Sequence, residues 1–281
     1  MSNKLIAIWG SPSSGKTITT LKLAQTLGAK NKNVLTIFSD PLCPSIPFLV
    51  PQIVNKQHSL GELLSLPALA QDDLLRFSFS IKSSPRLGLL GYSKGDHAFS
   101  YANYDRERAV DFLTLARHIA DVVLVDCTSY VSSSLLSTVA LELADTVFRF
   151  HTCDLKSMMF HASSLPLLSD ARFQHASSVS VLSNVRPGQD SRAYSQVVGG
   201  IRIELPHLHA LEQQALEARL LEALPASKET AAYQQGIAQM MQLIVPEELS
   251  PIRPKASPAL NGAAIVQGFK KLLLRRRGER K

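Results

Sequence analysis

Near its start the chain carries an eight-residue glycine- and serine-rich segment that constrains both the local fold and the ligand. Residues 10–17 are Gly-Ser-Pro-Ser-Ser-Gly-Lys-Thr, which fits the pattern G-x-x-x-x-G-K-[ST]. The apolar run at residues 5–9 is typical of a strand, and the apolar spacing over residues 18–27 predicts a helix. This pattern between a strand and a helix indicates a loop that binds phosphate.

The chemistry of such a loop follows from its residue types. Glycines let the main chain turn tightly, so that successive N–H groups and the start of the helix point at phosphate oxygens. The ammonium group of Lys16 would neutralise the β- and γ-phosphates, and the Thr17 hydroxyl would bind Mg²⁺. The predicted nucleotide-binding residues are Gly10, Ser11, Pro12, Ser13, Ser14, Gly15, Lys16, Thr17 and Ile18.

Strand and helix patterns alternate along most of the chain. Further strands are predicted at residues 33–38, 86–90, 122–125, 146–150, 179–182 and 201–205, and helices at 60–75, 105–119, 155–168 and 211–243. Residues 41–60 contain four prolines and are predicted to be a loop. The alternation predicts an α/β fold with a mostly parallel, doubly wound sheet flanked by helices.

Two acidic residues follow predicted strands. Asp126 ends the all-apolar strand 122–125, where a carboxylate beside a phosphate loop can hold magnesium through water; the alternative is a surface aspartate. Asp40 ends the strand 33–38 and would point at the same crevice if that strand neighbours the first. It would then orient an attacking water or complete the magnesium shell. An ordinary Asp-Pro turn explains it equally well.

The positive charge of the chain is concentrated at its C-terminal end. The net charge is +7, and residues 253–281 hold nine of the 30 basic residues but one of the 23 acidic ones. We predict a nucleotide-binding domain at 1–245, a linker with four prolines at 246–262, and a basic amphipathic helix at 263–281. Basic residues around an apolar face suit an anionic membrane, but a docked helix or a nucleic-acid contact remains open.

The cysteine content and the lengths of the apolar runs indicate the cellular compartment of the protein. Three cysteines, Cys43, Cys127 and Cys153, imply no disulfide framework, and no apolar run approaches the ~20 residues that span a bilayer. The first residues have too short an apolar stretch for a signal peptide. We therefore expect a cytoplasmic protein that can contact the inner face of the cell membrane through residues 263–281.

In order along the chain, the phosphate loop, NVLTIFSDP, DVVLVDCTS, ADTVFRFHTCDLKS and VSVLSNVRP resemble the MinD/ParA group of P-loop ATPases, including its TadZ/CpaE pilus-localisation branch. The resemblance covers about residues 3–245. It implies ATP and Mg²⁺ as ligands, Asp126 as the Walker B acid and Asp40 in hydrolysis. It also implies that Asn184 reads the adenine edge, that Pro206 lies near the loop flanking the base, and that the protein forms a nucleotide-linked homodimer.

Three positions depart from the family pattern. Ser11 stands where the family has its signature lysine, which reaches the partner's nucleotide. Phe38 replaces the first acid of the family's D-x-D-P motif. Residues 127–130 lack the proline and glycine of the D-x-P-x-G switch that follows the Walker B acid in the family. The expected function is a weakly hydrolysing ATPase that positions a pilus, secretion, conjugation or division machine. The alternatives are a non-hydrolysing nucleotide-bound scaffold, a DNA-partitioning ATPase and a P-loop kinase.

Overall fold

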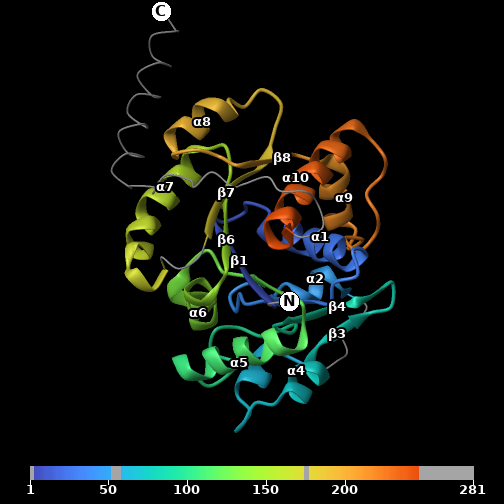
Figure 1. Ribbon diagram of the computed structural model, residues 1–281, viewed down its shortest axis with the longest axis vertical. Helices are drawn as coiled ribbons and strands as arrows, with labels where there is room; N and C mark the ends of the chain where they lie inside the picture. The colour runs from blue at the N-terminus through green and yellow to red at the C-terminus, as the bar shows by residue number, and fades with distance from the viewer. Residues whose placement is uncertain (1–2, 52–57, 174–176, 247–281) are drawn as a thin grey trace, which may run out of the picture.

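The chain folds around one eight-stranded sheet with helices on both faces (Figure 1). The computed structural model describes residues 3–51, 58–173 and 177–246. The strand order is β3-β4-β2-β5-β1-β6-β7-β8, and every neighbouring pair is parallel except β3 and β4. The predicted α/β class with a mostly parallel sheet is confirmed.

The element bounds follow the alternating pattern of the sequence. The strands are β1 (Lys4–Gly10), β2 (Val34–Phe38), β3 (Phe79–Ile81), β4 (Ser84–Gly91), β5 (Val122–Asp126), β6 (Thr146–His151), β7 (Ser177–Val185) and β8 (Ile203–Pro206). The helices are α1 (Lys16–Ala29), α2 (Ile46–Leu49), α3 (Leu60–Leu64), α4 (Gln71–Phe77), α5 (Arg106–Ile119), α6 (Leu135–Leu143), α7 (Leu155–Ser164), α8 (Ser191–Val197), α9 (His209–Leu216) and α10 (Lys228–Ile244).

Two apolar cores lie on opposite faces of the sheet. On one face, α1 and α10 pack on strand residues such as Ile6, Ile8 and Phe148. On the other face, α3 to α6 pack on the alternate strand residues, including Ala7 and Val125. Because successive strand residues point to opposite faces, a strand covered on both sides must be apolar throughout. This explains the continuous apolar run of β5.

The strand order decides which chain segments meet at the carboxyl edge of the sheet. β5 lies between β1 and β2, and Asp126 is in register with Ile8 of β1 and Phe38 of β2. The condition that β2 neighbours β1 is therefore wrong, because β5 separates them. In a parallel sheet the carboxyl ends still share one edge, so the residues after β1, β2 and β5 converge.

The helices and the sheet edge differ from the sequence prediction in several places. The helix predicted over residues 60–75 is two helices, α3 and α4, because Pro67 cannot donate an amide to a continuing helix. The helical region predicted over 211–243 is likewise divided into α9 and α10, with Pro225 in the connection. The antiparallel edge strand β3 and the helices α2, α6 and α8 are absent from the prediction. β3, α2 and α8 are too short to show a clear period, and α6 directly follows three serines at residues 132–134, which favour a loop.

The predicted linker and basic helix, at 246–262 and 263–281, lie outside the described residues except for Pro246. Within the described part of the chain, no helix combines the length and the apolar character needed to cross a membrane.

Candidate functional site

The predicted phosphate loop forms a tight turn between β1 and α1. Gly10 packs so closely on β6 that a Cβ there would lie 2.1 Å from the Phe150 carbonyl oxygen. Gly15 has a φ of 77° and Ser13 a φ of 59°, so both adopt the left-handed conformation that turns the loop. Among the described residues no side chain caps the start of α1, and its first turn holds no acid. The helix N-terminus is therefore available to an anion.

Lys16 closes over the loop. Its Nζ atom donates to the carbonyl oxygens of Gly10, at 3.3 Å, and Ser11, at 3.0 Å, and to the Ser129 Oγ at 2.8 Å. Burial lowers the pKa of Lys16 below its usual value, although the nearby carboxylate of Asp126 favours the charged form. A phosphate at this position would supply the negative charge that the carbonyl groups only partly provide.

Thr17 and Asp126 form a ready oxygen-ligand pair. The Thr17 hydroxyl donates to Asp126 Oδ2 at 2.6 Å, and the buried Asp126 Oδ1 has no hydrogen-bond partner among the described residues. Burial raises the pKa of Asp126 to about 6, against the opposing effects of Lys16 and Thr17. An unpartnered carboxylate oxygen beside a hydroxyl fits Mg²⁺, which usually takes one or two protein ligands and completes its shell with phosphate and water.

Asp40 occupies the same edge but is engaged in a turn. Its Oδ1 accepts hydrogen bonds from the main-chain amides of Leu42, at 2.9 Å, and Cys43, at 3.3 Å. Asp40 is near enough to contribute to the electrostatic environment of both Lys16 and Asp126. The turn that was one of its two predicted explanations is thus present, and the carboxylate still lies within electrostatic range of the loop.

Ser11, at the position of the missing signature lysine, points into the protein. Its side chain is buried, and its Oγ lies 3.0 Å from the Ser157 Oγ of α7. Ser157 also accepts hydrogen bonds from the Thr152 amide, at 3.1 Å, and the Tyr194 hydroxyl, at 3.2 Å. Since a hydroxyl accepts two hydrogen bonds and donates one, Ser157 donates to Ser11. Position 11 therefore braces the loop against α7 within one chain.

Two residues of the site, Ser129 and Trp9, are not predicted from the sequence. Ser129 lies in the segment after β5, and its hydroxyl oxygen accepts a hydrogen bond from the Lys16 ammonium group. The Ser129 carbonyl oxygen accepts a second hydrogen bond, from the Trp9 indole N–H at 3.0 Å. Trp9 is fully buried, with its ring centroid 5.4 Å from that of Phe160. A lone serine in a serine-rich segment carries no pattern, so only the hydrogen bonds reveal its place at the site.

The predicted base-binding residues lie at the ends of β7 and β8. Asn184 has a left-handed φ of 57°, and its neighbour Ser183 comes close to the phosphate loop, 3.3 Å from where a Cβ of Gly15 would lie. Pro206 is in register with Val185, one residue beyond Asn184. The next residue, His207, contacts the Asn184 side chain. The side chain of Ile18, by contrast, packs against the core, so only its main chain can face a phosphate.

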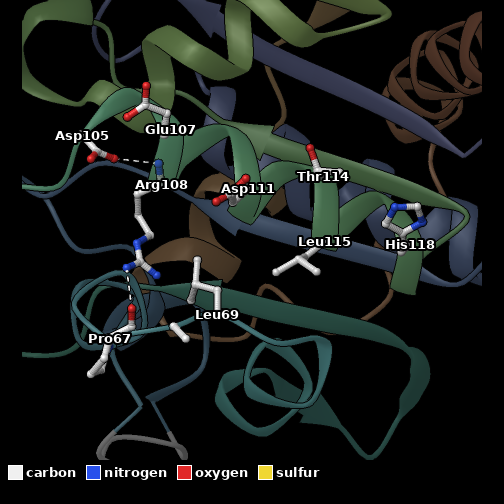
Figure 2. Close-up of a pocket in the computed structure, with 10 residues that line it drawn as sticks. Pro67, Leu69, Asp105, Glu107, Arg108, Asp111, Thr114, Leu115 and His118 are labelled. Carbon is white, nitrogen blue, oxygen red and sulfur yellow. Dashed lines mark hydrogen bonds between the residues drawn. The ribbon is translucent and has the colours of Figure 1, made fainter.

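A surface groove of the described structure lies away from this site. A groove of about 540 Å³ runs between α5 and residues 67–69, where Arg108 donates to the Pro67 carbonyl oxygen at 3.1 Å (Figure 2). None of the phosphate-loop residues lines it. The described residues also contain no group of three or more His, Cys, Asp or Glu side chains arranged to hold a metal ion. A magnesium ion at Thr17 and Asp126 would therefore depend on phosphate oxygens.

Comparisons with known proteins agree on the fold. Neither the protein-family profiles nor the curated protein sequences gave a match. Among solved structures, the septum site-determining protein MinD with Mg-ADP from Pyrococcus horikoshii OT3 matches with a TM-score of 0.67 and 17% identity, over 87% of this chain and 98% of that one. A ParA family ATPase from Chlorobium tepidum TLS matches with a TM-score of 0.69 and 17% identity, over 86% and 100%.

A third structure, the MinC:MinD cell division protein complex of Aquifex aeolicus, matches with a TM-score of 0.66 and 14% identity, over 88% of this chain and 98% of that chain. These similarities cover 86–88% of the chain. The identities are low, so they establish architecture rather than residue roles. The chain has the fold of the MinD and ParA P-loop ATPases.

Proposed function

We propose that the chain is an ATP-binding, weakly hydrolysing ATPase of the MinD/ParA type that positions a partner assembly. The observation that carries the proposal is the convergence of Lys16, Thr17 and Asp126 at the uncapped start of α1, with one carboxylate oxygen unpartnered. The MinD structure solved with Mg-ADP supports the choice of ligands, and the MinC:MinD complex supports a protein partner.

In this proposal each group has a defined task. Main-chain amides at the start of α1, from Gly15 to Ile18, and the Lys16 ammonium group bind the phosphates. Thr17 and Asp126 hold Mg²⁺, which offsets charge on the β- and γ-phosphates. Asp40 would orient the attacking water. Asn184 and the segment at Pro206 would receive the base.

A second candidate, a non-hydrolysing nucleotide-bound scaffold, is favoured by the state of Asp40. Its Oδ1 is occupied by two main-chain amides, and Phe38 stands at the place of the family's other acid. A carboxylate that stabilises a turn is a poor base, because the hydrogen bonds favour its ionised form without pointing it at water. Phosphate release measured with and without anionic vesicles separates the two candidates.

The single tryptophan offers a direct test of nucleotide binding. Trp9 is hydrogen-bonded to Ser129, which in turn holds Lys16, so a phosphate that draws Lys16 away alters the surroundings of the indole. Titration with Mg·ATP is expected to give a saturable change in tryptophan fluorescence. The affinity should match calorimetry, and Trp9→Phe should lose the optical signal while retaining the heat. Absence of both signals in the wild-type protein would exclude the proposed function.

The C-terminal segment 263–281 is proposed as a membrane-binding element. Ile265, Phe269, Leu272 and Leu273 share one helical face in the sequence, flanked by lysines and arginines. We expect the full chain to sediment with vesicles containing phosphatidylglycerol and not with vesicles of phosphatidylcholine alone. Leu272→Glu should weaken this binding at least about tenfold, since it places a charge on the apolar face.

A matched variant keeps the added charge off that face. Gln267→Glu introduces the same charge away from the apolar residues and is expected to bind vesicles nearly as well as the wild-type chain. Equal loss in both variants would point to simple electrostatics. Tighter binding to duplex DNA than to anionic vesicles would instead assign the segment to nucleic acid.

A further inference from the structure

Beside the proposed base-binding residue stands a histidine to which no role has been assigned. His207 Nδ1 lies 2.6 Å from the Oδ1 atom of Asn184. The contact joins the ends of two adjacent strands, because Asn184 is near the end of β7 and His207 directly follows β8. It is a short, direct bond between side chains 23 positions apart in the sequence.

Main-chain geometry holds the two side chains in place. The His207 amide donates to the Val185 carbonyl oxygen at 2.8 Å, which continues the pairing of Val185 with Pro206. Asn184 has its main chain in the left-handed region, a conformation that asparagine tolerates better than most residues. Main-chain pairing therefore brings the two side chains within reach of each other, and the His207 side chain is mostly covered, with 22% of its surface exposed.

A carboxylate faces the other side of the imidazole ring. Glu212 Oε2, at the first turn of α9, lies 3.6 Å from His207 Nε2 and 3.5 Å from His209 Nδ1. His207 is thus held between an amide oxygen on one nitrogen and a carboxylate on the other. His209 shares the carboxylate, but its side chain is largely exposed and no contact joins it to Asn184 in the described structure.

Counting hydrogens fixes what the amide can offer to a ligand. An amide oxygen can only accept, so the Nδ1 of His207 must donate to it. The oxygen accepts two hydrogen bonds in all, which leaves one acceptor position beside the two N–H donors of Asn184. One acceptor next to one donor is the complement of adenine, whose amino group donates beside a ring nitrogen that accepts. Guanine and hypoxanthine place an oxygen where adenine has its amino group, and that oxygen would face the amide oxygen.

Without a partner on its oxygen, the amide of Asn184 could turn by half a revolution and exchange its donor and acceptor. Either kind of purine could then be matched. We infer that His207 is a positioning residue that holds the Asn184 amide in the orientation selective for adenine over 6-oxopurine nucleotides. This inference rests on the proposed nucleotide site, where Ser183, next to Asn184, packs against Gly15 of the phosphate loop.

Selectivity between ATP and ITP is the appropriate measurement, because the two differ at the base edge and share the same phosphates. We expect the wild-type chain to bind Mg·ATP at least about tenfold more tightly than Mg·ITP, the equivalent of one well-matched hydrogen bond. His207→Phe keeps a ring of similar size but cannot donate a hydrogen bond to Asn184. We expect this variant to bind Mg·ATP only about threefold more tightly than Mg·ITP, or less, mainly because its affinity for ATP falls.

Two further variants separate positioning from general damage. His207→Asn places an amide N–H near the position of Nδ1 and should restore much of the preference for ATP. His209→Ala removes the neighbouring histidine, which also contacts Glu212, and should leave the ratio unchanged. Isothermal calorimetry with both nucleotides gives all four ratios, and circular dichroism checks that each variant is folded.

The outcomes distinguish this inference from the proposed function. If the wild-type chain binds neither ATP nor ITP, the nucleotide site and the role of His207 fall together. If it binds both nucleotides equally, or if His207→Phe keeps the wild-type ratio, the nucleotide site stands and the role of His207 is refuted. The same holds if His209→Ala narrows the ratio as much as His207→Phe does.

Discussion

Replacing Lys16 by alanine is expected to reduce the affinity for Mg·ATP at least roughly 100-fold, the equivalent of about 3 kcal/mol in charge-assisted hydrogen bonds. In the structure the ammonium group donates hydrogen bonds to two loop carbonyl groups and to Ser129, and a bound phosphate would replace these weaker partners. The variant should remain folded, because burial already disfavours the charged form of Lys16 and lowers its pKa.

Calorimetric titration with Mg·ATP, beside thermal unfolding without nucleotide, tests both parts of this expectation. Lys30→Ala is the matched control, since Lys30 is exposed at the other end of α1 and should leave binding unchanged. If Lys16→Ala bound ATP within about threefold of the wild-type affinity, the phosphate-loop assignment would be wrong.

Replacing Asp126 by asparagine should have two opposite effects. The variant is expected to lose the Mg²⁺ dependence of nucleotide binding, because an amide cannot replace the carboxylate that pairs with Thr17. The free energy of unfolding without nucleotide should rise by about 3 kcal/mol above pH 7, because the buried, unpartnered carboxylate has its pKa raised to about 6. A functional group that costs stability is typical of a ligand site.

The pH dependence of this cost has a definite sign. Below about pH 3 the carboxyl group is protonated in both the folded and the unfolded chain, so it contributes no difference. Between about pH 4 and pH 6 it ionises first in the unfolded chain, which makes the wild-type protein progressively less stable relative to Asp126→Asn. Above pH 6 the difference is constant. Magnesium binding follows the ionised form and should weaken below pH 6.

Urea denaturation of the wild-type and variant chains at pH 4.5 and 7.5 measures this difference, and the contributions of all other groups cancel in the comparison. Asp111→Asn on α5 removes the same charge from an exposed position and serves as the control. A stability difference that is equal at both pH values would show that burial does not perturb Asp126. A variant that still requires Mg²⁺ would remove Asp126 from the metal site.

Much of the architecture and part of the site could be predicted from local patterns. The phosphate loop is a contiguous motif whose chemistry depends on its own glycines, Lys16 and Thr17. The strand β5 is recognisable in the sequence because a strand buried on both faces must be apolar throughout. The exact bounds of the helices interrupted by prolines and of the short edge strand β3 could not be predicted, since a few residues show too weak a hydrophobic periodicity to be recognised.

What the sequence by itself determined is therefore the α/β class, the phosphate loop and the acid at the end of β5, because each is encoded in consecutive residues. Only the tertiary structure decided that β5 separates β2 from β1, that Ser11 braces α7, and that Ser129 holds Lys16. It also decided that His207 contacts Asn184. The physical reason is that hydrogen bonds between distant segments depend on strand order and register, and these arise only when both faces of the sheet are packed.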